Sequence, residues 1–212
     1  MYFDYFFWDY DGTLFDTYPC VTRAYLKGLK ELGIEMDYNE LYGLTKISLG
    51  YTAKVLSARD GVPSDVILAH YHNHAEDEGY EAMHPYDGAR ELLEDIISQG
   101  GRNYLYTHRN MSGIYALEHH GIDMLFTDYI TSENGFPSKP APDALKFLVG
   151  KHNLDLSRCV MLGDREIDVQ AGLNAGMDGA LFDPDGYYQH APVKYRFTTM
   201  QAIRGAFVRS SK

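Results

Sequence analysis

The sequence predicts an α/β fold, a Rossmann-like parallel sheet with helices on both faces, into which an all-helical domain is inserted. Two observations support this prediction. From residue 86 onward, short apolar segments alternate with helix-like segments, and the chain begins with a further apolar segment at residues 2–9. Residues 17–85, in contrast, contain no convincing strand pattern. We therefore expect a Rossmann-like core formed by residues 1–16 and 86–212 and a helical cap domain formed by residues 17–85.

The core pattern predicts a regular alternation of strands and helices. Apart from residues 2–9, the strand-like segments are residues 103–107, 125–131, 158–162 and 179–182. The helix-like segments between them are residues 87–100, 112–120, 142–150 and 166–175, and each ends at or next to a glycine. Strands that alternate with helices form parallel sheets covered on both faces, so the segment at residues 2–9 must join this sheet.

The inserted region is predicted to form three helices. They cover residues 18–32, 48–59 and 64–83, with breaks at Gly33, Gly43 and the Gly61-Val62-Pro63 sequence. A helical block placed directly after the first strand is expected to lie over the carboxyl ends of the sheet, where open parallel sheets bind their ligands. We expect this cap domain to determine which ligand is accepted.

The composition is typical of a soluble globular protein and argues against two classes of partner. The chain has 212 residues, of which 45% are hydrophobic and 23% charged. Its net charge of −11 argues against binding to nucleic acid or to an anionic membrane, because both need a basic face. The two cysteines are far apart in sequence, and no basic segment precedes an apolar run at the N-terminus. We therefore expect no disulfide, no signal peptide and a cytoplasmic location.

Two aspartates follow the first predicted strand, and their spacing is the strongest chemical signal in the chain. Asp9 and Asp11 lie on the same side of an extended backbone. Two carboxylates this close together stay ionised only beside a cation; otherwise one of them keeps a proton. An ionised carboxylate can act as a nucleophile and a protonated one as a general acid. The alternatives are an acidic turn or a calcium loop, but an EF-hand loop starting at Asp9 would need glycine where Leu14 stands.

Further polar residues stand at the ends of other predicted elements. Thr107 ends a strand, Lys139 precedes a helix, and Asp164 follows another strand, with Asp168 one helical turn further on. Taken singly, they have ordinary interpretations as a helix cap, a solvated lysine, a turn and a solvent-facing carboxylate. Together, the aspartates and the backbone carbonyl of Asp11 provide the hard oxygen ligands that Mg²⁺ prefers. The threonine and the lysine provide hydrogen-bond donors and positive charge for a phosphoryl group.

These residues resemble the four ordered motifs of the haloacid dehalogenase-like phosphohydrolases. The matching segments are DYDGTLFD at 9–16, Thr107, Lys139 within SKPAPD, and GDREID at 163–168. The helical block matches the position of the cap in the branch that includes phosphoglycolate phosphatases and β-phosphoglucomutases. The resemblance spans nearly the whole chain and implies a Mg²⁺-dependent phosphatase. Its substrate would be a small phosphorylated metabolite, similar to phosphoglycolate or a sugar phosphate.

The resemblance also implies a role for each residue. Asp9 would attack the phosphorus and form an aspartyl-phosphate, while Asp11 would protonate the leaving oxygen and then activate water. Asp168 would either bind the ion or fix a water molecule or the lysine. The residues implied to hold Mg²⁺ are Asp9, Asp11 through its carbonyl, Asp164 and Asp168. The implied substrate contacts are Thr107, His108, Lys139 and Lys46.

Three of these interpretations stay open at this point. Lys46, in a glycine-flanked loop between cap helices, either contacts the remote end of the substrate or is a surface lysine. His108 either contacts the phosphate or fills the wall of the cleft. His70 and His74 share a helix face with Glu78 at a spacing that metal ions accept, but a solvated helix face is the simpler explanation.

Two other functions are compatible with the predicted fold, a phosphosugar mutase and a non-catalytic regulatory protein that binds a phosphometabolite. β-Phosphoglucomutases typically carry a histidine shortly after the first motif, where this chain has residues 19–22, and a glutamate where it has Gly163. Both differences favour hydrolysis. A pure binding protein has no need of the Asp9–Asp11 pair, and the true dehalogenases of the family lack an equivalent of Asp11.

Overall fold

The chain forms two compact units. The computed structural model describes residues 2–75 and 77–208. One unit combines Met1–Phe15 with Pro85–Lys212, and the other is Asp16–His84. The chain passes between them through two short strands, β2 (Phe15–Asp16) and β3 (His84–Pro85), which pair with each other in a separate sheet.

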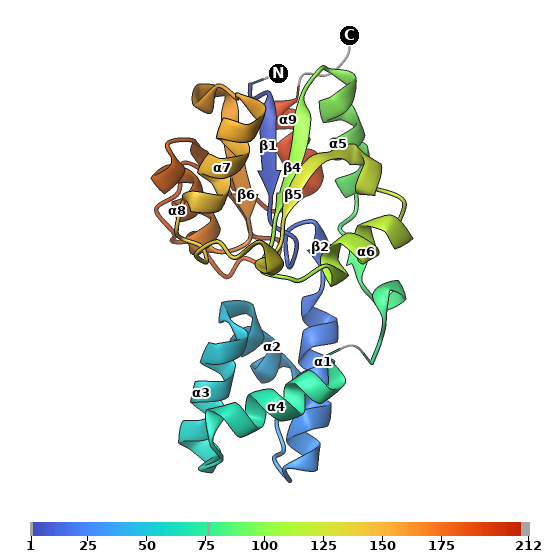
Figure 1. The fold of residues 1–212 in the computed structure, drawn as a ribbon. Helices are drawn as coiled ribbons and strands as arrows, with labels where there is room; N and C mark the ends of the chain where they lie inside the picture. Colours follow the sequence, from blue (N-terminus) through green and yellow to red (C-terminus); the bar gives the residue numbers. More distant parts are fainter. Residues whose placement is uncertain (1, 76, 209–212) are drawn as a thin grey trace. The chain divides into compact units, whose positions relative to one another are not determined.

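Among the described residues, the first unit is built on a six-stranded parallel sheet with the order β5-β4-β1-β6-β7-β8 (Figure 1). Strand β1 is central, and Trp8 at its end is paired with Leu105 of β4 and Leu162 of β6. The parallel sheet with its flanking helices confirms the predicted Rossmann-like α/β class. The strands are β1 (Tyr5–Trp8), β4 (Arg102–Tyr106), β5 (Phe126–Ile130), β6 (Cys159–Gly163), β7 (Asp178–Phe182) and β8 (Tyr195–Phe197).

Alternate side chains of β1 pack against helices on opposite faces of the sheet. Phe7 lies in a cluster of buried residues that includes side chains of α7 and α8. On the other face, the rings of Phe6 and Phe207 of α9 are 6.5 Å apart. Trp8 Nε1 donates to Asn103 Oδ1, whose amide donates to a carbonyl of α5. The helices of this unit are α5 (Ala89–Ser98), α6 (Ser112–His119), α7 (Asp143–His152), α8 (Glu166–Ala175) and α9 (Met200–Phe207).

The second unit is helical and has its own core. Its buried side chains come from all four helices and include Tyr25, Leu41, Leu56 and Ile67. This core is the reason that the unit is compact by itself. Its helices are α1 (Tyr18–Glu31), α2 (Tyr38–Ile47), α3 (Leu49–Asp60) and α4 (Ser64–His74). Within the described part of the chain, no helix has the length and apolar character needed to cross a membrane.

The structure corrects the predicted elements in three places. The sequence predicts a break at Gly43 and a loop around Lys46, but both lie in α2, which is capped by Asp37, whose carboxylate accepts from the amides of Asn39 and Glu40. Helix α4 ends at His74, whereas the prediction extended it to residue 83. Strand β8 and helix α9 have no counterpart in the prediction, because no element was assigned beyond residue 182.

Candidate active site

Three neighbouring strands end side by side, and a predicted site residue follows directly after each of them. Asp9 follows β1, Thr107 follows β4, and Asp164 follows β6. The pairing continues past the strand ends, because the amide of Asp9 donates to the carbonyl of Leu162 (2.8 Å) and that of Thr107 to the carbonyl of Ile130 (3.0 Å). The residues therefore stand on a rigid edge, at the position where parallel α/β sheets bind ligands.

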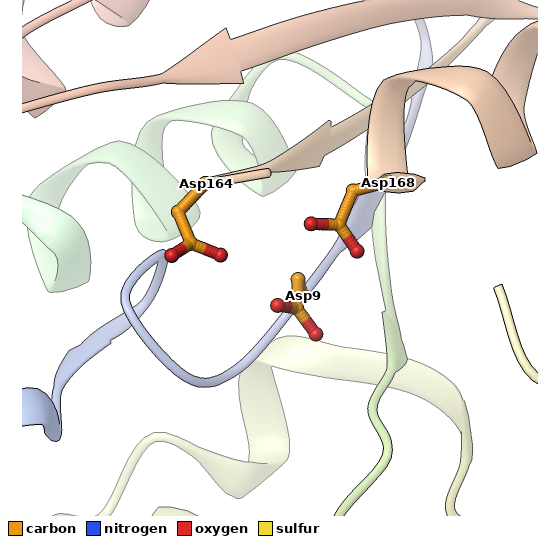
Figure 2. A group of neighbouring side chains, drawn as sticks. All are labelled: Asp9, Asp164 and Asp168. Atoms are coloured by element: carbon orange, nitrogen blue, oxygen red, sulfur yellow. The ribbon is translucent and has the colours of Figure 1, made fainter. Parts of the chain in front are cut away.

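Three aspartates form a buried carboxylate group at this edge. Oxygen atoms of Asp9, Asp164 and Asp168 all lie within 4.8 Å of one another (Figure 2). Asp168 comes from the first turn of α8 and reaches back to accept a hydrogen bond from the amide of Arg165 (3.1 Å). Gly163 makes this packing possible, because a Cβ atom at that position would lie 2.1 Å from the Cβ of Asp168.

Lys139 supplies a buried positive charge between two of the carboxylates. Its Nζ lies 2.6 Å from Asp9 Oδ1 and 2.8 Å from Asp168 Oδ1, and the ring of Tyr106 lies 4.7 Å away. Burial opposes the charge on the lysine, but the carboxylates of Asp168 and Asp9 outweigh it and hold its pKa above the usual value. Lys139 is therefore a fixed cation in the site.

One ammonium group does not compensate all three carboxylates. Burial raises the pKa of Asp9 to about 6 against the opposing effect of Lys139, and the neighbouring Asp168 raises it further. The pKa of Asp168 is lowered, because Lys139 and Arg165 outweigh its burial. Asp9 Oδ2 is buried and has no hydrogen-bond partner among the described residues. An unsatisfied carboxylate oxygen within a buried group of hard oxygen donors fits a divalent cation.

Asp11 lies outside this carboxylate group. The chain turns sharply at Gly12, whose φ of 70° lies in the left-handed region that favours glycine. The Asp11 carboxylate accepts from Arg109 Nε at 2.8 and 3.0 Å, and Arg109 Nη2 lies 2.7 Å from Asp11 Oδ1. Arg109 is not among the site residues predicted from the sequence. The signal in the sequence that could have identified it is a basic residue two positions after Thr107, the polar residue that follows a strand.

Thr107 and His108 follow β4, and His108 contacts the segment that carries Lys139. The Thr107 hydroxyl accepts a hydrogen bond from the amide of Arg109 (3.0 Å). His108 Nε2 accepts one from the amide of Lys139 (3.2 Å), so the imidazole supports the lysine backbone. Burial, together with the nearby Lys139 and Arg165, lowers the pKa of His108 to about 4. His108 is therefore neutral at pH 7 and acts as an acceptor toward the lysine segment.

Lys46 lies in the helical unit, near the end of α2. The expectation that it stands in a loop was wrong, because α2 extends to Ile47. Its side chain is buried, and Nζ lies 4.3 Å from the centre of the Tyr18 ring. The interpretation of Lys46 as an exposed surface lysine is therefore excluded, and its interaction with substrate stays a prediction.

Two histidines of the helical unit, His70 and His74, are hydrogen-bonded to carboxylates. His70 and His74 both contact the carboxylate of Glu31, at 2.7 and 2.9 Å. Glu78 makes a bidentate pair with Arg23. Within the residues that the structure describes, the only group of acidic, histidine or cysteine side chains close enough to share a metal ion is the three aspartates of the sheet edge.

Comparisons with known proteins match this architecture. The family model of the haloacid dehalogenase-like hydrolases matches residues 6–182. A phosphoglycolate phosphatase of Aliivibrio fischeri is 29% identical over 181 residues, which cover 79% of this chain and 78% of that protein. A 6-phosphogluconate phosphatase of Escherichia coli is 30% identical over 84% of this chain and 82% of its own length. A solved hydrolase of Streptococcus pneumoniae superposes with a TM-score of 0.70 at 31% identity, covering 97% of this chain and 98% of that one.

The chain belongs to the haloacid dehalogenase-like hydrolases, because the family model covers most of its length and includes β1, β4 and β6. Within that family it is a phosphatase, and the enzyme class predicted from the sequence is confirmed. Three of the four motifs on which the prediction rested, those that contain Asp9, Lys139 and the Asp164–Asp168 pair, form the carboxylate group and its lysine.

Proposed function

We propose that this phosphatase hydrolyses the phosphate monoester of a small metabolite with Mg²⁺ as its cofactor, through an aspartyl-phosphate on Asp9. The environment of Asp9 is the observation that carries the proposal. One of its carboxylate oxygens bonds to Lys139, and the other is buried without a hydrogen-bond partner among the described residues. Because Lys139 fixes the carboxylate, the second oxygen is pre-positioned for a ligand or a reacting phosphorus atom.

In the proposed reaction, an oxygen of Asp9 forms a bond to phosphorus as the ester bond to the leaving oxygen breaks. Asp11 gives its proton to the leaving oxygen and later takes one from the water that cleaves the aspartyl-phosphate, which releases inorganic phosphate and restores Asp9. Lys139 neutralises part of the negative charge that Asp9 and the substrate bring together.

The cation site of the proposal consists of Asp9, Asp164, Asp168 and the backbone carbonyl of Asp11. A bound Mg²⁺ would supply positive charge opposite an anionic substrate, next to an anionic nucleophile. Asp168 is already bound to Lys139, so we assign it mainly to holding the lysine.

The substrate contacts that we propose lie in both units. In the first unit, Thr107, His108 and Lys139 surround the end of β4 and are proposed to hold the phosphoryl group. In the helical unit, Lys46 offers a positive charge that suits a substrate with a second anionic group. Phosphoglycolate and 6-phosphogluconate, which name two relatives, both carry a carboxylate. We propose a phosphorylated carboxylic or sugar acid as the preferred substrate class, processed in the cytoplasm.

The packing around Gly163 favours hydrolysis over the mutase alternative. β-Phosphoglucomutases resemble this chain but commonly have a glutamate at that position. With Asp168 where it lies, the first carbon of any side chain at position 163 would overlap it at 2.1 Å. A regulatory binding protein is also disfavoured, because the burial that raises the pKa of Asp9 is a cost that binding alone does not require.

The experiment that tests the proposal is the substitution Asp9→Asn, assayed with a generic phosphate ester and a panel of phosphorylated acids in Mg²⁺. We expect turnover to fall by at least about 10³-fold, as for other nucleophile substitutions. Asp4→Asn, just before the same strand, serves as the control and should retain activity. Excess EDTA should stop turnover by the unmodified enzyme. Turnover of Asp9→Asn close to that of the unmodified enzyme would exclude Asp9 as the nucleophile, and turnover in EDTA would exclude the metal.

A further inference from the structure

The carboxylate assigned to proton transfer is already engaged in the structure. Both oxygens of Asp11 accept from Arg109 Nε, and Oδ1 also lies 2.7 Å from Nη2. An arginine that holds a carboxylate through two nitrogens fixes its orientation as well as its charge. Asp11 therefore has to leave this arrangement before it can give a proton to a leaving group.

The position of the Arg109 guanidinium is set by its surroundings. The Tyr10 ring lies 5.2 Å from its central carbon, a distance typical of a cation–π contact. The arginine backbone is held on both sides, because its amide donates to the Thr107 hydroxyl and its carbonyl accepts from the amide of Ser132 (2.8 Å). Gly113 of α6 lies beside the arginine stem, and a Cβ there would be in ordinary van der Waals contact with the arginine Cβ at 3.5 Å.

This ion pair differs from that of Lys139 in its contact with solvent. The side chains of Arg109 and Asp11 are 21% and 30% exposed, whereas that of Lys139 is fully buried. Because a partly solvated ion pair contributes less stability than a fully buried one, another anion competes more readily for Arg109 than for Lys139. Arg109 also follows Thr107 by two residues, and the proposed function assigns Thr107 to the phosphoryl group. Arg109 is thus a partly exposed cation whose backbone contacts the residue assigned to the phosphoryl group.

We propose that Arg109 exchanges partners during the reaction: it holds Asp11 in the resting enzyme and binds the phosphoryl group of the substrate instead. A phosphoryl dianion carries more charge than a carboxylate and offers three oxygens to the planar guanidinium. Substrate binding thereby releases the Asp11 carboxylate, which takes up a proton from solvent and can then give it to the leaving oxygen, so that the acid becomes available only when a phosphate ester is present. This inference rests on the proposed function, because it names the residue that couples substrate binding to Asp11.

The test compares Arg109→Gln and Arg109→Lys with the unmodified enzyme in steady-state assays. We expect KM for a phosphate ester to rise about 10- to 100-fold in Arg109→Gln, the effect of losing a charge-assisted contact, while kcat changes less than about threefold. Arg109→Lys should recover part of the KM because it keeps the charge. A fall in kcat of more than about tenfold at unchanged KM would overturn the exchange, because it would mean that Arg109 holds Asp11 in its working position.

A binding measurement keeps the result independent of turnover. Titration calorimetry with inorganic phosphate and Mg²⁺ should give an affinity about tenfold or more weaker for Arg109→Gln than for the unmodified protein. Equal affinities would overturn the proposal. Arg158→Gln is a matched control, because it removes another bidentate pair, with Asp4, and should leave the phosphate affinity unchanged. If no ester is turned over but phosphate binding depends on Arg109, the proposed function fails while the phosphate contact of Arg109 stands.

Discussion

Strand β1 has an aspartate–arginine pair beyond each of its ends, and the two pairs lie in different surroundings. Before the strand, Asp4 accepts from Arg158 at 2.9 and 2.8 Å. After it, Asp11 accepts from Arg109 Nε at 2.8 and 3.0 Å. The first pair stands at the amino ends of the parallel strands, and the second stands beside the buried carboxylate group at their carboxyl ends. The pair before the strand thus has a structural role, whereas the pair after it is the one that we propose to exchange partners when substrate binds.

The pKa values of Asp4 and Asp9, at the two ends of β1, are shifted in opposite directions. The hydrogen bonds from Arg158 lower the pKa of Asp4, so the ionised form of Asp4 favours folding. Burial raises the pKa of Asp9, so the ionised form of Asp9 opposes folding. The contrast shows that the fold accepts the cost of burying the Asp9 carboxylate at the edge where the proposed chemistry takes place, whereas ionised Asp4 stabilises the fold at the other end of the strand.

The largest expected effect comes from removing the buried cation. Lys139→Met leaves Asp9 and Asp168 buried without their counter-charge, which typically costs about 3–5 kcal/mol of unfolding free energy. Urea denaturation at pH 7.5 in EDTA measures this loss, and phosphatase activity should be lost as well. Lys194→Met is the control, because its exposed pair with Asp178 should contribute less than about 1 kcal/mol. A loss below about 1 kcal/mol for Lys139→Met would show that the buried pairs do not support the fold.

A smaller effect is expected in the pH dependence of stability without metal. Because the pKa of Asp9 is raised to about 6, its contribution favours folding below its usual pKa of 3.8 and is lost as the pH rises through 6. The unfolding free energy of Asp9→Asn relative to the unmodified protein should therefore increase by about 2–3 kcal/mol between pH 4 and pH 7 in EDTA.

Asp9→Asn is compared with the unmodified protein because His108 changes the unfolding free energy with pH in the opposite direction to Asp9. Its pKa is lowered to about 4, so its contribution rises over the same pH range in both proteins and cancels in the difference. Urea denaturation series at several pH values would give the difference curve. A curve that is flat from pH 4 to pH 7 would mean that Asp9 has an ordinary pKa in the folded protein.

The smallest effect is expected at the amino end of the strand. Arg158→Gln should lower the unfolding free energy by no more than about 1 kcal/mol, because the side chains of Arg158 and Asp4 are 38% and 36% exposed. Thermal unfolding at low and high salt would detect it, with the difference from the unmodified protein shrinking in high salt. A change in KM caused by this substitution would contradict the conclusion that the Asp4–Arg158 pair has a structural role and no role in substrate binding.

Most of the core could be predicted from the sequence because its signals are local. Short apolar segments alternate with amphipathic ones, and glycines mark the helix ends, so the strands and helices from residue 86 to 182 were predicted near their observed positions. The errors arose where a local signal misleads. Gly43 suggested a break, but the cap at Asp37 and the packing of Leu41 in the core of the helical unit keep α2 continuous.

The sequence by itself determined the class of enzyme and the carboxylates of the candidate site, because the polarity of a parallel sheet brings residues that follow its strands to one edge. It also pointed to Lys139 and Asp168. Only the tertiary structure decided how these charges are divided: Lys139 is bound to Asp9 and Asp168, whereas Asp11 is bound to Arg109. Two of these pairings, Asp9 with Lys139 and Asp11 with Arg109, join residues 130 and 98 positions apart and depend on strand order, burial and the turn at Gly12. No local pattern in the sequence contains that information.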